Sequence, residues 1–235
     1  MKAVWSAVAS RLNLYWLAAI SIGGKYFWLV VLAPVSWVAT NWLLSSVWGL
    51  RIIGPADVQI GLVATPLALL GLVLGVRIVA GEIRSRNLEI IYTVPGGCEK
   101  VWWAKLFASG LMLVVAGTLL ALTSWMLTPF PVLALYGSLQ ASAFYLVLAM
   151  GFSTLFRSEV GGGIASFAIL TFNWMISQDG PARISPFFNS YVVEAEFEEV
   201  IAMTVQNRIG FLLVIAAIIA LTFMRTNRRE RMLGA

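Results

Sequence analysis

Long apolar runs are the feature that most constrains this chain. Several reach the roughly 20 residues that an α-helix needs to cross about 30 Å of hydrocarbon. Hydrophobic residues make up 60% of the 235 residues, and charged residues only 11%, against roughly 25% in an ordinary soluble domain. In lipid the backbone must satisfy its own hydrogen bonds, and the alternating pattern of barrel strands is absent. The sequence therefore predicts an all-α polytopic membrane protein.

The whole chain, residues 1–235, is predicted to be one transmembrane domain with six transmembrane helices. The predicted spans are residues 26–47, 58–80, 102–127, 132–156, 161–177 and 209–224. Residues 81–101 form a polar segment between the second and third spans, and residues 178–207 form an outer segment in which we expect re-entrant or short helices. Gly71 and Gly75 make a GxxxG pair, which lets another helix approach closely, either in the same bundle or in a second copy.

Residues 1–24 precede the spans and are apolar but interrupted. Lys2, Arg11 and Asn13 break the run, and the hydrophobic side chains recur near helical spacing. We therefore expect an N-terminal amphipathic helix lying in the membrane interface. An additional spanning helix is the alternative, and it would place Met1 on the opposite side.

Basic residues are distributed unevenly between the predicted loops. If both termini are cytoplasmic, all 16 Lys and Arg residues except Arg51, Arg183 and Arg208 lie on the inner side. This asymmetry satisfies the positive-inside rule and predicts cytoplasmic termini. It also explains the net charge of +5 without nucleic acid as a partner. We expect a multi-pass protein of a bacterial or archaeal cell membrane.

Several kinds of chemistry are not expected. The chain has no histidine, which is the commonest metal ligand and acid–base catalyst, and its one cysteine, Cys98, is expected to be a bystander. The middles of the predicted spans contain almost no ionisable groups, which argues against a carrier driven by protons or sodium. No GxxxxGK[ST] loop occurs in the sequence, so ATP hydrolysis by this chain alone is not expected.

Residues 81–101 contain the most motif-like pattern. The pattern consists of Glu82, Ser85, Leu88, Glu89, Pro95 and, ten residues later, Lys105. It resembles the segment between the second and third spans of ABC-2 type transporter permeases. That segment commonly reads E-R-E-x-G-T-L-E, followed by an apolar run, a proline and a lysine. Arg86 and Asn87 stand where the family usually has Gly and Thr. The helix pattern and the basic C-terminal tail extend the resemblance over nearly the whole chain.

The resemblance implies that the chain is the permease subunit of an ABC exporter. A short coupling helix around residues 87–93 would dock on a separate cytoplasmic ATP-binding subunit, which would hold ATP and Mg²⁺, and this chain would bind no cofactor. Two permease subunits, identical or different, would pair in membrane lipid and export an amphipathic or lipid-like substrate. The implied coupling residues are Glu82, Arg86, Asn87, Leu88, Glu89, Tyr92 and Pro95.

Glu82 and Glu89 are seven residues apart, so on a continuous helix they would share a face with Arg86 between them. We expect Glu82 to brace this helix against the N-terminal segment and Glu89 to dock on the ATPase. A charge at Leu88 should then uncouple ATP hydrolysis from transport in a folded protein.

The alternative hypothesis is a membrane sensor or assembly factor that binds a non-ATPase partner. An intramembrane enzyme, which would use Cys98 or the outer glutamates, is a more remote alternative.

Overall fold

The computed structural model describes residues 13, 15–47, 58–93, 97–178, 184–191, 193 and 196–228. All regular elements in this part of the chain are helical. They are α2 (Phe27–Ser46), the π-helix η1 (Val58–Ala64), α4 (Thr65–Arg84), α5 (Leu88–Thr93), α6 (Cys98–Leu127), α7 (Leu133–Phe156), α8 (Glu159–Gln178) and α9 (Phe197–Thr226). Residues 15–23 are helical as well.

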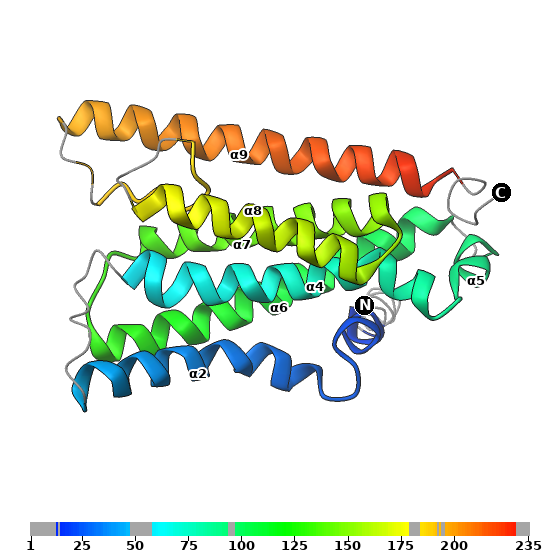
Figure 1. The fold of residues 1–235 in the computed structure, drawn as a ribbon, viewed down its shortest axis with the longest axis horizontal. Coiled ribbons are helices and arrows are strands. Elements are labelled where there is room, and N and C mark those ends of the chain that lie inside the picture. Colours follow the sequence, from blue (N-terminus) through cyan, green and yellow to red (C-terminus); the bar gives the residue numbers. More distant parts are fainter. Residues whose placement is uncertain are drawn as a thin grey trace, which may run out of the picture.

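Six of the described helices are long and apolar enough to cross a membrane, with η1 and α4 counted as one continuous span. Figure 1 shows them side by side in one elongated bundle, with α5 beyond one end. We call this end the α5 end and the opposite one the distal end. The predicted all-α architecture with six spanning helices is confirmed, and the chain is a multi-pass membrane protein.

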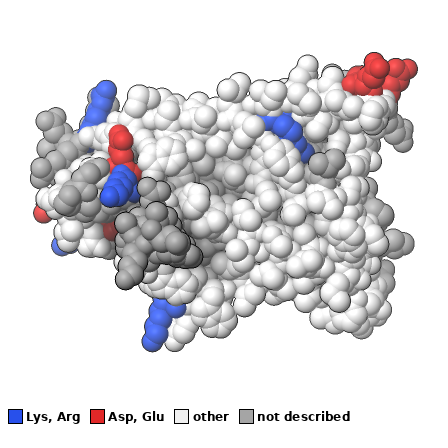
Figure 2. Space-filling model, turned by 180° about the vertical axis from the view of Figure 1, so that it is seen from behind, with Lys and Arg blue, Asp and Glu red and all other residues white. Residues whose placement is uncertain are grey.

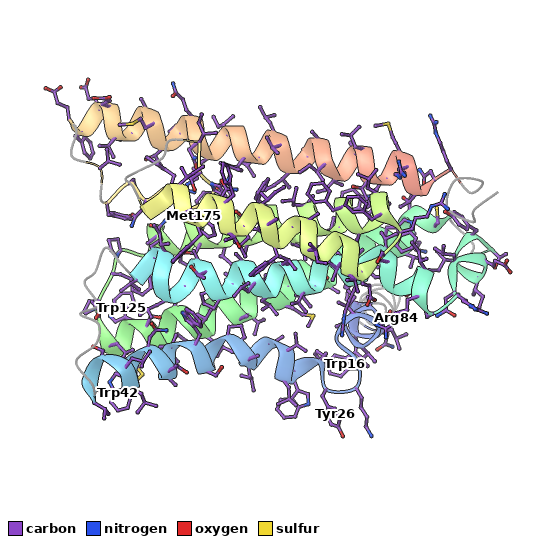
Figure 3. All side chains as sticks on the ribbon, viewed as in Figure 1. Trp16, Tyr26, Trp42, Arg84, Trp125 and Met175 are labelled. Atoms are coloured by element: carbon purple, nitrogen blue, oxygen red, sulfur yellow. The ribbon has the colours of Figure 1, made fainter. Side chains whose placement is uncertain are left out.

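The surface and the bundle ends match this membrane character. Figure 2 shows one face of the molecule. Most charged side chains on this face lie toward the two ends of the bundle, and most of the surface between them is uncharged. Trp42 and Trp125 lie near the distal end, and Trp16 and Tyr26 lie near the α5 end (Figure 3). Aromatic side chains at both ends of a bundle are typical of the two membrane–water interfaces.

The centre of the bundle is the contact between α4 and α7. Of the most apolar stretch of η1 and α4, 78% of the residues are buried, against 17% for α8 and for α9. Gly71 and Gly75 face α7. A Cβ added at Gly71 would lie 2.5 Å from the carbonyl oxygen of Ser142, and one added at Gly75 would overlap the carbonyl oxygen of Leu146. The GxxxG pair therefore brings two helices of the same chain together.

The described part of the N-terminal segment is amphipathic. Ala18, Ala19 and Ile22 are buried, whereas Trp16 and Leu17 are exposed. Figure 1 shows this dark-blue helix nearly end-on, so it runs across the direction of α2 at the α5 end of the bundle. Residues 1–12 and 14 of the predicted amphipathic helix lie outside the described residues.

Two helices begin earlier than the predicted spans. α6 begins at Cys98 rather than at residue 102, and α9 begins at Phe197 rather than at residue 209. α9 has 30 residues, so residues 197–207 belong to one continuous helix and not to short helices of an outer segment. The acidic pair Glu198 and Glu199 in its first turn suits a helix N-terminus, whose backbone N–H groups favour negative charge.

The segment before α9 folds back into the distal end of the bundle. Phe187 and Phe188 are only 2% and 1% exposed, and Phe187 stacks on Tyr145 of α7 with ring centroids 5.6 Å apart. The described residues 184–191 form turns rather than the short helices that we expected. Asn207 of α9 donates to the carbonyl oxygen of Ser185 at 3.0 Å, so this segment contacts both α7 and α9.

Replacing Gly75 by alanine should destabilise the bundle. The added Cβ would meet backbone atoms of α7, which cannot rotate away as a side chain can. We expect a loss of about 1–3 kcal/mol, the usual cost of overpacking. It would appear as a lower melting temperature of the monodisperse protein in detergent. G110A is the matched control because a Cβ at Gly110 meets nothing within 4 Å. Equal melting temperatures of the two variants would contradict this account of the α4–α7 contact.

Candidate coupling site

The chain reverses sharply between α4 and α5. The N–H of Asn87 donates to the carbonyl oxygen of Glu82 at 3.1 Å, and the N–H of Arg86 donates to that of Ile83 at 3.2 Å. These two bonds form a Schellman motif, in which the residue after the C-cap adopts a left-handed conformation. That residue is Arg86, with φ of 58°. Glu82 and Glu89 therefore do not lie on one continuous helix.

Glu82 points into the bundle. Lys105 of α6 donates a hydrogen bond to its Oε1, and the Ser21 hydroxyl donates to the same oxygen at 3.2 Å. The side chains of Lys105 and Glu82 are only 5% and 11% exposed. Glu82 thus joins α4, α6 and the N-terminal helix, and its side chain is largely buried.

Two arginines tie the same end of α4 to other elements. Arg77 donates to the carbonyl oxygen of Ile22 in the N-terminal helix at 3.0 Å. Arg84, labelled in Figure 3, pairs with Glu159 at the start of α8 at 3.0 Å. The Arg84 side chain is 80% exposed, so this second pair is a surface contact. The end of α4 is therefore held from three sides.

The short helix α5 has a buried face and an exposed face. Leu88 and Ile91 are 5% and 6% exposed, whereas Ile90 is 64% exposed and Glu89 is also exposed. The hydroxyl of Tyr92 donates to the carbonyl oxygen of Thr226 at the end of α9, at 2.5 Å. A charge at Leu88 would enter the apolar core. This burial argues against the expectation that such a variant stays folded, and Glu89 and Ile90 are among the exposed positions of α5.

The last turn of α9 also contacts the start of α6. The Cys98 thiol donates to the Asn227 side-chain oxygen at 3.3 Å, and the Asn227 amide donates to Glu99. One turn further along, Trp103 packs edge-on against Phe223 with ring centroids 5.0 Å apart. The start of α6 and the end of α9 are therefore in direct contact.

The predicted site residues divide into three groups. Glu82, Leu88 and Tyr92 make contacts inside the bundle, whereas Arg86, Asn87 and Glu89 are exposed at the reversal and on α5. Pro95 lies outside the described residues. Sequence reasoning missed the residues that anchor this site from distant elements, because no spacing rule links them to α5. They are Ser21, Arg77, Glu159, Thr226 and Asn227.

No family model matches this chain, and no curated protein or solved structure matches it either. Among the described residues there is also no group of three or more acidic or cysteine side chains that would hold a metal ion.

Removing one partner of the buried Glu82–Lys105 pair should cost more than removing both. E82Q leaves the Lys105 ammonium buried without a carboxylate, and such a loss typically costs about 3–5 kcal/mol. The double variant E82Q/K105M should recover much of that loss, as measured by the melting temperature in detergent. R84Q is the control, because an exposed ion pair contributes at most about 1 kcal/mol. Strictly additive effects of E82Q and K105M would contradict the coupling between the two side chains.

Proposed function

We propose that the chain is the membrane-spanning permease subunit of an ATP-driven ABC-2 type transporter. The observation that carries the proposal is α5, a six-residue helix between the second and third spanning helices. Its Leu88 and Ile91 anchor it in the bundle, and its Glu89 and Ile90 remain exposed. An anchored helix with an exposed acidic and apolar face is suited to dock in a groove of a cytoplasmic ATP-binding subunit.

The backbone at Arg86 supports the same proposal. The ABC-2 pattern usually has glycine at this position, and glycine is the residue that most easily adopts the left-handed conformation of a helix C-terminus. Arg86 adopts that conformation here, with φ of 58°. The departure from the family pattern therefore changes the side chain but keeps the turn that separates α4 from α5.

The contacts of α5 provide a route for coupling. ATP-driven closure of the partner would move α5, and buried contacts would pass this movement to the spanning helices. Tyr92 is bonded to the end of α9, and the Glu82–Lys105 pair joins α4 to α6 next to the reversal. ATP and Mg²⁺ belong to the partner subunit in this proposal. Two permease subunits, identical or different, would pair around the transport pathway and export an amphipathic substrate.

The distribution of charge favours an orientation with the α5 end in the cytoplasm. Apart from Arg208, the described basic residues lie toward that end, as the positive-inside rule requires. They are Lys25, Arg77, Arg84, Arg86, Lys100, Lys105, Arg157, Arg225 and Arg228. The amphipathic helix of residues 15–23 runs across the bundle at the same end, a position that suits an interfacial helix.

Cysteine labelling tests this orientation. In a C98S background, T93C and I184C place single thiols at exposed positions of the α5 end and the distal end, respectively. A membrane-impermeant maleimide should label I184C in intact cells and T93C only after permeabilisation. The reverse pattern would contradict the proposed topology.

Copurification tests the docking role of α5. The chain, purified gently from its native membrane, should bring with it an ATP-binding subunit that is identified by mass spectrometry and ATPase activity. I90D places a charge in the exposed apolar centre of the docking face, so we expect at least a tenfold loss of copurified ATPase, equivalent to about 1.4 kcal/mol.

I184D is the matched control for I90D. It makes the same substitution at a position that is 89% exposed, at the other end of the bundle. Both variants should remain monodisperse, and only I90D should lose the ATPase. Recovery of a kinase or other regulator in place of an ATPase would instead favour a sensor or assembly factor.

A further inference from the structure

An apolar groove runs between α6, α7 and α9. Its volume is about 560 Å³, and α7 contacts both flanking helices. The walls are mainly apolar, with Phe107 and Val114 from α6 and Leu212, Ile215 and Ile219 from α9 among the lining residues. Phe107 and Val114 are about half exposed, at 52% and 49%, so the groove is open rather than sealed.

The guanidinium of Arg208 lies next to the distal end of this groove, in contact with two of the lining residues. Arg208 precedes Leu212 by one helical turn on the stripe of α9 that continues through Ile215 and Ile219. The guanidinium carbon of Arg208 lies 5.9 Å from the ring centroid of Tyr136, and Arg208 donates to the Gln140 side-chain oxygen at 3.4 Å. Tyr136 and Gln140 both line the groove. The groove is therefore apolar along its length, and Arg208 places a cation beside its distal end.

The charge of Arg208 has no carboxylate partner within the described part of the chain, where the ion pairs are Arg84–Glu159 and Lys105–Glu82. Its contacts are with neutral groups, including the carbonyl oxygen of Phe188 at 3.2 Å. A guanidinium carries five N–H donors, and these neutral contacts leave its positive charge available to pair with an anion.

Gly137 of α7 sets the position of the guanidinium. A Cβ added there would lie 2.5 Å from Nη2 of Arg208 and 2.9 Å from Nε2 of Gln59. The guanidinium therefore rests directly against the backbone of α7. An alanine at residue 137 would displace it without removing its charge.

We propose that this groove binds an amphiphile with an anionic headgroup, with the headgroup on Arg208 and an alkyl chain between α6 and α9. The stripe from Arg208 to Ile219 spans about 16 Å at 1.5 Å per residue, which accommodates a medium-length alkyl chain. Charge complementarity at one end and an apolar channel along the rest select an anionic lipid over a zwitterionic one. That this ligand is the transported substrate rests on the function proposed above.

Photolabelling of the purified chain in lipid nanodiscs tests the site. The probes are phosphatidylglycerol and phosphatidylcholine, each with a diazirine on an acyl chain, at equal concentration. Labelled residues are mapped by mass spectrometry. Phosphatidylglycerol should label groove residues such as Phe107 and Leu212 about tenfold more than phosphatidylcholine, because the choline cation offsets the charge of the phosphate that both lipids carry; the ratio is equivalent to about 1.4 kcal/mol. Ile164 and Phe172 on the exposed side of α8 report labelling by bulk lipid.

Four variants separate the headgroup contact from the chain contact. R208Q should abolish the preference for phosphatidylglycerol, and G137A should weaken it with the charge retained. G110L should reduce groove labelling by both lipids, because Gly110 lines the groove and has open space for the new side chain. G210L adds the same side chain at an open position of α9 that does not line this groove, so it should label as the unmodified protein does.

The proposal is overturned if R208Q and G137A keep the full preference, or if groove residues label no more than Ile164 and Phe172. The assay needs no ATPase. Loss of ATPase copurification with an intact lipid preference would therefore leave the lipid site standing and remove only its role in transport.

Discussion

The buried pair of Glu82 and Lys105 is the interaction on which the α5 end depends. Charges placed inside an apolar bundle must be neutralised, so the end of α4 and the second turn of α6 are fixed to each other. The Ser21 hydroxyl bonds to the same carboxylate and attaches the N-terminal helix. With both flanking helices held, the chain between them is short and its orientation is constrained. The apolar face of α5 is then buried, and Glu89 and Ile90 are left exposed.

The two ends of the bundle treat charge differently, and the same two helices connect them. At the α5 end, Arg84 and Lys105 pair with carboxylates, whereas Arg208 toward the distal end has neutral neighbours among the described residues. Trp103 of α6 lines the groove and also packs on Phe223 of α9. A change in the separation of α6 and α9 at this aromatic contact would alter the width of the groove. The proposed coupling site and the proposed ligand site thus share α6 and α9.

Sequence patterns located the elements better than they located the contacts. Hydropathy predicted six spans because spanning helices need length and apolarity, which a single sequence displays directly. It placed the start of α9 at residue 209, because hydropathy alone does not show that a polar first stretch continues the same helix. It also missed the burial of Leu88, since the Schellman turn at Arg86 rotates α5 relative to α4. The predicted span beginning at residue 209 leaves Arg208 outside the membrane helices, so hydropathy does not predict its position beside an apolar groove.

The long helix α9 connects the proposed coupling site at α5 with the proposed ligand site at Arg208. It is one continuous helix of 30 residues and is among the least buried in the bundle, so it has fewer packing contacts that resist a rigid shift. One end carries Thr226, which accepts the hydrogen bond from Tyr92 of α5, and Arg208 lies about 27 Å away at 1.5 Å per residue. A helix transmits a displacement along its axis because its backbone hydrogen bonds keep it stiff. In the proposed mechanism, a movement of α5 toward or away from the bundle would shift Arg208 relative to Gly137 and Phe188. This shift would change the contact between Arg208 and a bound anion.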